Sequence, residues 1–152
     1  FDFQLAVDPW LVPAGIAANL ATGRVAFTIA GDGDFLMTGQ EFATASQHGG
    51  KSIIVLLNTG MFGTIRLHQE PEYPERTSGT ALRNPDFCGL ARAYGYAAER
   101  VTETAQFEAA LLRALEAETG TLIEIPLDPE VITTRGTLSS ITRSAKQQQV
   151  RG

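Results

Sequence analysis

The chain has 152 residues, of which 43% are hydrophobic and 19% charged, a composition typical of one globular domain with a buried core. Its net charge of −5 argues against nucleic acid as the main partner, because phosphate contacts need a basic face. A single cysteine excludes an internal disulfide, and neither a membrane-spanning apolar run nor a leader is evident, so we expect a cytoplasmic protein with no membrane partner.

Helices and strands are predicted to alternate along the chain. In order, the pattern predicts a helix at 13–20, a strand at 25–30, a helix at 38–48, a strand at 52–57, a short helix at 64–69, a helix beginning within 84–87, a strand at 96–101, a helix at 104–118 and a strand at 121–125. The first two strands are rich in apolar and β-branched residues, which is typical of strands buried on both faces. The alternation predicts the α/β class, with a doubly wound parallel sheet and helices on both faces.

Three local signals have structural interpretations. Thr38 and Glu41 have the spacing of a helix capping box. Asn84, directly before a proline, is typical of a helix N-cap. Cys88 has no basic or histidine neighbour close in sequence, so we interpret it as a small buried hydrophobic residue.

The C-terminal third combines an amphipathic helix with a polar end. On the helix predicted at 104–118, the spacing of Phe107, Leu111 and Leu115 predicts a buried stripe that packs on the sheet. The polar content rises towards the end of the chain, and we expect a partly disordered tail at 136–152.

Glycine-rich polar segments follow the first two predicted strands. They are Gly31-Asp32-Gly33-Asp34-Phe35 and Asn58-Thr59-Gly60-Met61-Phe62-Gly63. The carboxyl ends of parallel strands meet at one sheet edge, which is where ligands bind in open α/β sheets. At that edge exposed N–H groups suit phosphate oxygens, and Asp32 with a neutral oxygen from Asn58 or Thr59 suits Mg²⁺. From the residues alone, the alternative is a pair of tight turns without a ligand.

The same two segments resemble the diphosphate-binding motif of thiamine-diphosphate enzymes, in which Gly-Asp-Gly is followed by an Asn-Asn pair. Residues 31–45 and 58–66 are similar to the acetolactate-synthase-like branch, and the likeness extends through 84–87 towards Pro126. It covers about residues 12 to 135, most of the chain. The resemblance implies the thiamine-diphosphate-binding fold, with residues 1–152 forming one diphosphate-binding domain, the C-terminal part of a longer enzyme.

The resemblance also implies roles for individual residues. Mg²⁺ would be held by Asp32, Thr59 and the carbonyl oxygen of Met61, and the backbone N–H groups of Gly33 and Asp34 would face the diphosphate. The cofactor-binding residues that it implies are Gly31, Asp32, Gly33, Asp34, Phe35, Asn58, Gly60, Met61 and Phe62. No catalytic residue is expected in this domain, because in the family the activating glutamate comes from the pyrimidine-binding domain of the same or another subunit.

Two positions and one segment depart from the family pattern. Thr59 stands where the family usually has an asparagine that binds the metal. The segment at 6–13 lacks the glycines and the large apolar residue that support the bent cofactor in relatives. Ile65 stands where pyruvate-decarboxylase-like relatives carry an acidic residue, which favours carbon–carbon bond formation over simple decarboxylation.

By resemblance, the enzyme uses thiamine diphosphate and Mg²⁺ to decarboxylate a 2-oxo acid and transfers the product to a second carbonyl compound, within a homo-oligomer. The isolated domain is expected to be inactive, and FAD in the intact protein has no support from these residues. Two alternatives within the family are a degenerate non-catalytic domain with an oligomerisation or regulatory role, and a simple 2-oxo-acid decarboxylase. A third is a mononucleotide-binding α/β protein with Asp32 on the nucleotide's Mg²⁺, although no P-loop sequence is present.

Overall fold

The computed structural model describes residues 10–134 and 136–151. It forms two compact units. The first unit contains the residues up to Asn58 together with Asn84–Pro126, and the second contains Thr59–Arg83 and the residues from Leu127 onward. Within the segment that departs from the family pattern, residues 6–9 lie outside the described residues.

The first unit is built on a parallel sheet of four strands, in the order β1-β2-β4-β3. The strands are β1 (Phe27–Gly31), β2 (Ile53–Asn58), β3 (Ala97–Arg100) and β4 (Thr121–Pro126). In the register of the sheet, Gly31 pairs with Leu57 and Asn58 pairs with Pro126. The parallel sheet expected from the alternation of elements is therefore confirmed, and the carboxyl ends of β1 and β2 lie side by side.

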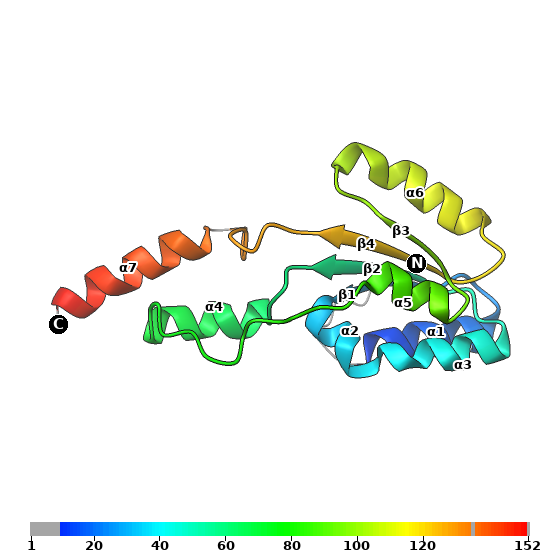
Figure 1. The fold of residues 1–152 in the computed structure, drawn as a ribbon, viewed down its shortest axis with the longest axis horizontal. Helices are drawn as coiled ribbons and strands as arrows, with labels where there is room; N and C mark the ends of the chain where they lie inside the picture. The colour runs from blue at the N-terminus through cyan, green and yellow to red at the C-terminus, as the bar shows by residue number, and fades with distance from the viewer. Residues whose placement is uncertain (1–9, 135, 152) are drawn as a thin grey trace. The chain divides into compact units, whose positions relative to one another are not determined.

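Helices cover both faces of this sheet, as Figure 1 shows. Along β2, Ile54 and Leu56 face a core that includes Phe42, whereas Ile53 and Val55 face the other side, because side chains alternate along a strand. Helix α6 covers the second face, and α1, α3 and α5 cover the first (Figure 1). The helices of this unit are α1 (Leu11–Thr22), α2 (Asp32–Thr38), the 3₁₀ turn η1 (Gly39–Glu41), α3 (Phe42–His48), α5 (Phe87–Ala93) and α6 (Thr104–Glu116).

One local prediction in this unit is wrong, and another is right only in part. Thr38 makes no side-chain cap bond to the helix that follows it, and the Glu41 carboxylate instead accepts a 2.7 Å hydrogen bond from the Thr44 hydroxyl. On α6, Phe107 and Leu111 pack against the core on this face as predicted, together with the buried Ala110 and Ala114, but Leu115 is 52% exposed. The small alanines place the helix backbone near the strands, so the stripe is rotated away from the larger leucine.

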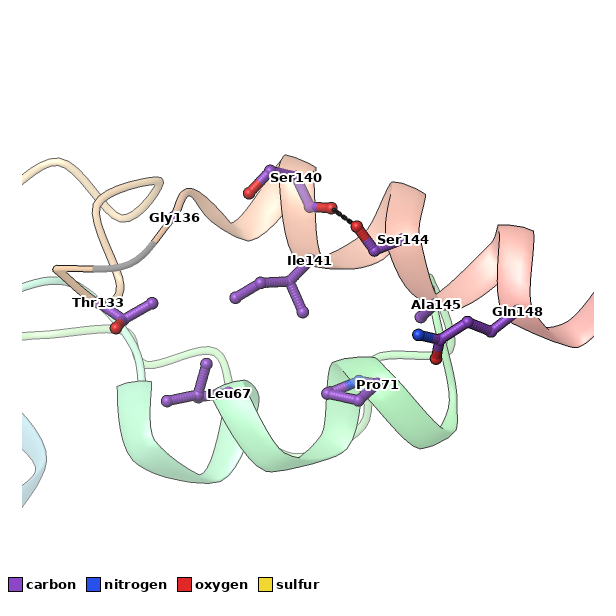
Figure 2. Close-up of a pocket in the computed structure, with 9 residues that line it drawn as sticks. All are labelled: Leu67, Pro71, Thr133, Gly136, Ser140, Ile141, Ser144, Ala145 and Gln148. Atoms are coloured by element: carbon purple, nitrogen blue, oxygen red, sulfur yellow. Dashed lines mark hydrogen bonds between the residues drawn. The ribbon is translucent and has the colours of Figure 1, made fainter.

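The second unit is organised around α4 (Gly63–Glu72) and α7 (Leu138–Arg151). Helix α7 occupies most of the segment in which the sequence predicts a partly disordered tail. Figure 2 shows Ile141 of α7 facing Leu67 of α4, and Ala145 is buried. Because Ile141 and Ala145 are four residues apart, they form one narrow apolar stripe on this polar segment. The polar composition of the segment as a whole therefore predicts a tail where a helix forms.

None of the helices within the described part of the chain is long and apolar enough to cross a membrane.

Candidate functional site

Asp32 begins helix α2 directly at the carboxyl end of β1, where the glycines around it predict a loop. Its side chain is buried, with 2% exposed, and its Oδ1 accepts a 3.1 Å hydrogen bond from the N–H of Gly33. The helix forms because Phe35, one turn later, is buried and packs edge to face on Phe42 and Phe87, with ring centroids 5.3 and 5.4 Å apart. Since the Phe35 side chain lies in the core, a contact with a cofactor would have to come from its backbone.

Asn84 connects the ends of the two strands. Its Nδ2 donates hydrogen bonds to Asp32 Oδ2 at 2.7 Å and to Asn58 Oδ1 at 2.8 Å. The sequence predicts Asn84 as a helix cap, which is wrong, because α5 starts at Phe87 with Asp86 in the N-cap position. The structure thus brings together Asp32 and Asn58, as predicted from the sheet edge, and adds an asparagine that the sequence did not reveal as part of the site.

A second polar residue behind this site, Glu124, was also missed. It lies on β4 with 1% of its surface exposed, and its Oε1 accepts a 2.8 Å hydrogen bond from Asn58 Nδ2. Its Oε2 accepts from Arg100 Nε at 3.0 Å and from the Cys88 thiol at 3.4 Å. An acidic residue inside the apolar strand 121–125 was the signal available in the sequence, because a buried carboxylate requires partners.

Cys88 is buried, as predicted. Burial, together with the hydrogen bond to and the charge of Glu124, raises the pKa of its thiol to about 11. Among the described residues, Asp86, Cys88 and Glu124 are the one group whose acidic and thiol ligand atoms lie close enough to hold a metal. The Arg100 guanidinium already lies 3.0 Å from Glu124 and 3.8 Å from Asp86, so its charge occupies the position that a cation would need.

The second unit contains the other predicted ligands. The Thr59 hydroxyl donates a 3.1 Å hydrogen bond to the Met61 carbonyl, so two of the three residues predicted to bind the metal are in contact. Gly60, between them, has φ +70°, a conformation that favours glycine. The Gly60 carbonyl accepts from the N–H of Leu82, and the N–H of Phe62 donates to the Thr80 carbonyl, both at 2.8 Å, which holds this turn in place.

The donor atoms near Asp32 fit a hard divalent cation such as Mg²⁺. The Asp32 carboxylate supplies the kind of oxygen ligand that Mg²⁺ prefers, and Asn84 turns its Nδ2 towards Asp32 and Asn58. Asn84 Oδ1 is buried and has no hydrogen-bond partner among the described residues. A buried acceptor without a partner costs free energy, and a cation or its bound water would satisfy it.

The second unit also has a surface pocket of about 560 Å³ between α4 and α7. Figure 2 shows Leu67 and Pro71 of α4 and Ile141 of α7 around it, with serine and glutamine side chains at its edge. None of the described side chains that line it titrates near neutral pH, so this pocket has no group for acid–base chemistry.

Comparison with known proteins identifies the relatives of the chain. A family model described as "Thiamine pyrophosphate enzyme, C-terminal TPP binding domain" matches residues 10–125. The chain is 34% identical over 117 residues to an acetolactate synthase large subunit of Parasynechococcus marenigrum, covering 75% of this chain and 19% of that protein. It is 40% identical over 121 residues to a probable 2-ketoarginine decarboxylase of Pseudomonas aeruginosa, covering 75% and 21%.

A solved structure has the same fold. The thiamine diphosphate-dependent 4-hydroxybenzoylformate decarboxylase of Rhodococcus jostii superimposes with a TM-score of 0.74 at 29% identity, over 80% of this chain and 23% of that one. The chain therefore spans about a fifth of the length of the relatives it matches. Because the family model covers most of the chain, the chain belongs to the family of C-terminal thiamine-pyrophosphate-binding domains of thiamine pyrophosphate enzymes.

Proposed function

We propose that this chain holds the diphosphate of thiamine diphosphate through Mg²⁺, in an acetolactate-synthase-like enzyme that decarboxylates a 2-oxo acid and transfers the product to a second carbonyl compound. The observation that carries the proposal is the buried Asp32 carboxylate at the end of β1, fixed by Asn84 beside the end of β2. In an open α/β sheet this edge is the ligand edge, and a carboxylate there suits a metal–diphosphate group.

The roles of the binding residues follow from their chemistry. Asp32, Thr59 and the Met61 carbonyl would supply oxygen ligands to Mg²⁺. The hydroxyl of Thr59 has lone pairs for a metal as well as the proton that it now donates to Met61. The backbone N–H groups of Gly33 and Asp34, in the first turn of α2, would face the phosphate oxygens of the diphosphate. The remaining proposed cofactor contacts are Gly31, Phe35, Asn58, Gly60 and Phe62.

When bound, the cofactor would supply the chemistry that side chains lack, which is an electron sink for the decarboxylation of a 2-oxo acid. The part of this chain is to bind and orient the diphosphate, which fixes where the ring points. We propose that the activating glutamate comes from a pyrimidine-binding domain of the same or another subunit in a homo-oligomer. On that basis, the 152 residues alone should not turn over substrate.

A simple 2-oxo-acid decarboxylase is the second candidate. It is favoured by the 40% identity to a probable decarboxylase and by the fold of the solved decarboxylase. Ile65, in place of the acidic residue of pyruvate-decarboxylase-like relatives, favours carbon–carbon bond formation instead. The product distinguishes the two reactions. A decarboxylase releases an aldehyde from one 2-oxo acid, whereas a carboligase joins the decarboxylated fragment to a second carbonyl compound and releases a 2-hydroxyketone.

Calorimetric titration of the full-length protein with thiamine diphosphate, with and without Mg²⁺, tests the binding proposal. We expect Mg²⁺-dependent binding that Asp32→Ala abolishes. Glu108→Ala is the matched control, because it removes the same charge from an exposed position on α6 and should bind as the wild type does. Absence of binding, or equal binding by Asp32→Ala, would contradict the proposal.

The same titration separates this proposal from a degenerate, non-catalytic domain. A degenerate domain shows no Mg²⁺-dependent binding and gains none from Thr59→Asn, which restores the usual asparagine of the family. If Thr59 is a working ligand, the wild type binds, and Thr59→Asn binds with equal or higher affinity because the longer amide oxygen reaches the metal directly.

A further inference from the structure

Five polar side chains of the first unit form one continuous hydrogen-bonded chain beneath the proposed site. It runs from Arg100 on β3 through Glu124 on β4 to Asn58 on β2, and from there through Asn84 to Asp32 at the end of β1. Each link is between 2.7 and 3.0 Å long. The chain therefore crosses all four strands of the sheet and ends at the carboxylate that the proposed function assigns to the metal.

The carboxylates of Glu124 and Asp32 fix which atom donates and which accepts in every hydrogen bond between them. Glu124, paired with Arg100, can only accept, so Asn58 must present its Nδ2 to it and its Oδ1 to Asn84. Asn84 must then donate to Asn58, and it donates to Asp32 as well, which uses both of its Nδ2 hydrogens. The carboxylates of Glu124 and Asp32, on either side of the two asparagines, thus fix both amide orientations, and only Asn84 Oδ1 has no hydrogen-bond partner among the described residues.

Resting on the proposed function, we infer that Asn84 is a positioning residue for the metal–diphosphate site. Its amide holds Asp32 Oδ2 and Asn58 Oδ1 at fixed places, so that Asp32 would meet Mg²⁺ in one orientation. Asn84 acts through Asp32 and is not itself assigned as a metal ligand. Residues that orient metal ligands in this way contribute strongly to metal affinity, because a free carboxylate must give up rotamer freedom when it binds.

A role in stability alone would not account for the placement of Asn84. It starts no helix and lies 52 residues from Asp32 in sequence. Both of its amide hydrogens nevertheless bond to Asp32 and Asn58, at the carboxyl ends of β1 and β2. Asn19 provides a structural counterpart. Its amide donates to the Arg24 carbonyl and accepts from the N–H of Lys51, both at 2.7 Å, next to the amino ends of the same two strands.

The test compares Asn84→Ala with Asn19→Ala in the full-length protein. The measured quantity is the Mg²⁺ concentration that gives half-maximal binding of thiamine diphosphate, determined by calorimetry, with electron paramagnetic resonance of Mn²⁺ as a direct probe of the metal. Asn84→Ala should raise this concentration by roughly 10- to 100-fold, the usual effect of removing a residue that orients a metal ligand. Asn19→Ala removes an equally bonded asparagine and should change it less than about twofold, even if the melting temperature falls by the same amount.

Each outcome decides the inference. If the wild type shows Mg²⁺-dependent binding that Asp32→Ala abolishes, but Asn84→Ala binds like the wild type, the proposed function stands and the positioning role is wrong. Equal shifts in Asn84→Ala and Asn19→Ala would also overturn it, because the effect would then be one of stability. If the wild type itself shows no Mg²⁺-dependent binding, both the proposed function and this inference fail. Should Asn84→Ala not fold, Asn84→Gln, which keeps the amide but displaces it, is expected to give a shift in the same direction.

Discussion

Phe35 links the core of the first unit to the proposed site, and its truncation gives the sharpest test of that link. Its ring is 1% exposed, and it makes edge-to-face contacts with Phe42 and Phe87. Asp32 begins the same short helix three residues earlier, so the helix has this one aromatic anchor where it meets the core. Removing the ring should loosen α2 and, with it, the carboxylate of the site.

The size of the effect follows from the burial. Replacing a fully buried phenylalanine by alanine costs about 3–5 kcal/mol through lost transfer free energy and the cavity left behind. The two aromatic contacts, each contributing about 0.5–1.5 kcal/mol beyond burial, place Phe35→Ala towards the upper part of that range. Domains are stable by only about 5–15 kcal/mol, so this loss is a large share of the total and should sharply lower the urea midpoint of Phe35→Ala, whereas Phe35→Leu should cost less.

Urea denaturation followed by circular dichroism measures the free energy of unfolding. Leu115→Ala is the control, since Leu115 also lies on a helix of this unit but is 52% exposed, and its loss should cost under about 0.5 kcal/mol. Equal losses of stability in the two variants would refute the role of Phe35 as the anchor of α2. A loss confined to stability, with the Mg²⁺ dependence of cofactor binding unchanged in Phe35→Leu, would refute the proposed link between this core and the site.

Three further predictions concern other parts of the chain. With its pKa raised to about 11, Cys88 should resist alkylation at pH 8 in the native protein and react in denaturant; rapid native labelling would contradict its burial. Burial tends to raise the pKa of Glu70, but hydrogen bonds from Thr142 and the N–H of Glu75, with the charges of Arg66 and Lys146, together hold it below 4.5. A lowered pKa stabilises the fold above the unfolded value and loses this contribution as pH falls below about 4.5, so Glu70→Gln should flatten the acid limb of the stability curve, and an unchanged limb would refute this. Gly15→Ala would place a methyl group 2.1 Å from the buried Thr28 hydroxyl, so it should lower the melting temperature, and an unchanged value would show that α1 does not pack on β1 as described.

The sheet could be predicted from the sequence because its signal is local. Strands buried on both faces need runs of apolar and β-branched residues, and β1 and β2 have them. The meeting of Asp32 and Asn58 also follows, since parallel neighbours end at the same edge and Gly31 pairs with Leu57. These predictions required only the period of the pattern and the rule for parallel sheets.

Helices α2 and α7 could not be predicted from local composition. Gly31 to Asp34 have the composition of a loop, but burial of Phe35 against Phe42 outweighs the weak helix propensity of the segment. The polar segment of α7 is likewise helical because Ile141 and Ala145 share one face, a spacing that its overall polarity obscures. In both cases tertiary burial decides the secondary structure.

The case of Asn84 shows why the site itself is harder to predict than the sheet that carries it. An asparagine before a proline satisfies the rule for a helix cap, and nothing within a few residues of it indicates otherwise. Its actual partners, Asp32 and Asn58, lie 52 and 26 residues away and become neighbours only when β1 and β2 pair. The same holds for Glu124, whose partner Asn58 is 66 residues distant. Predicting a site made of long-range polar contacts requires the topology of the sheet and the direction of each hydrogen bond. The direction can be assigned only when a buried carboxylate fixes which atom of the amide must face it.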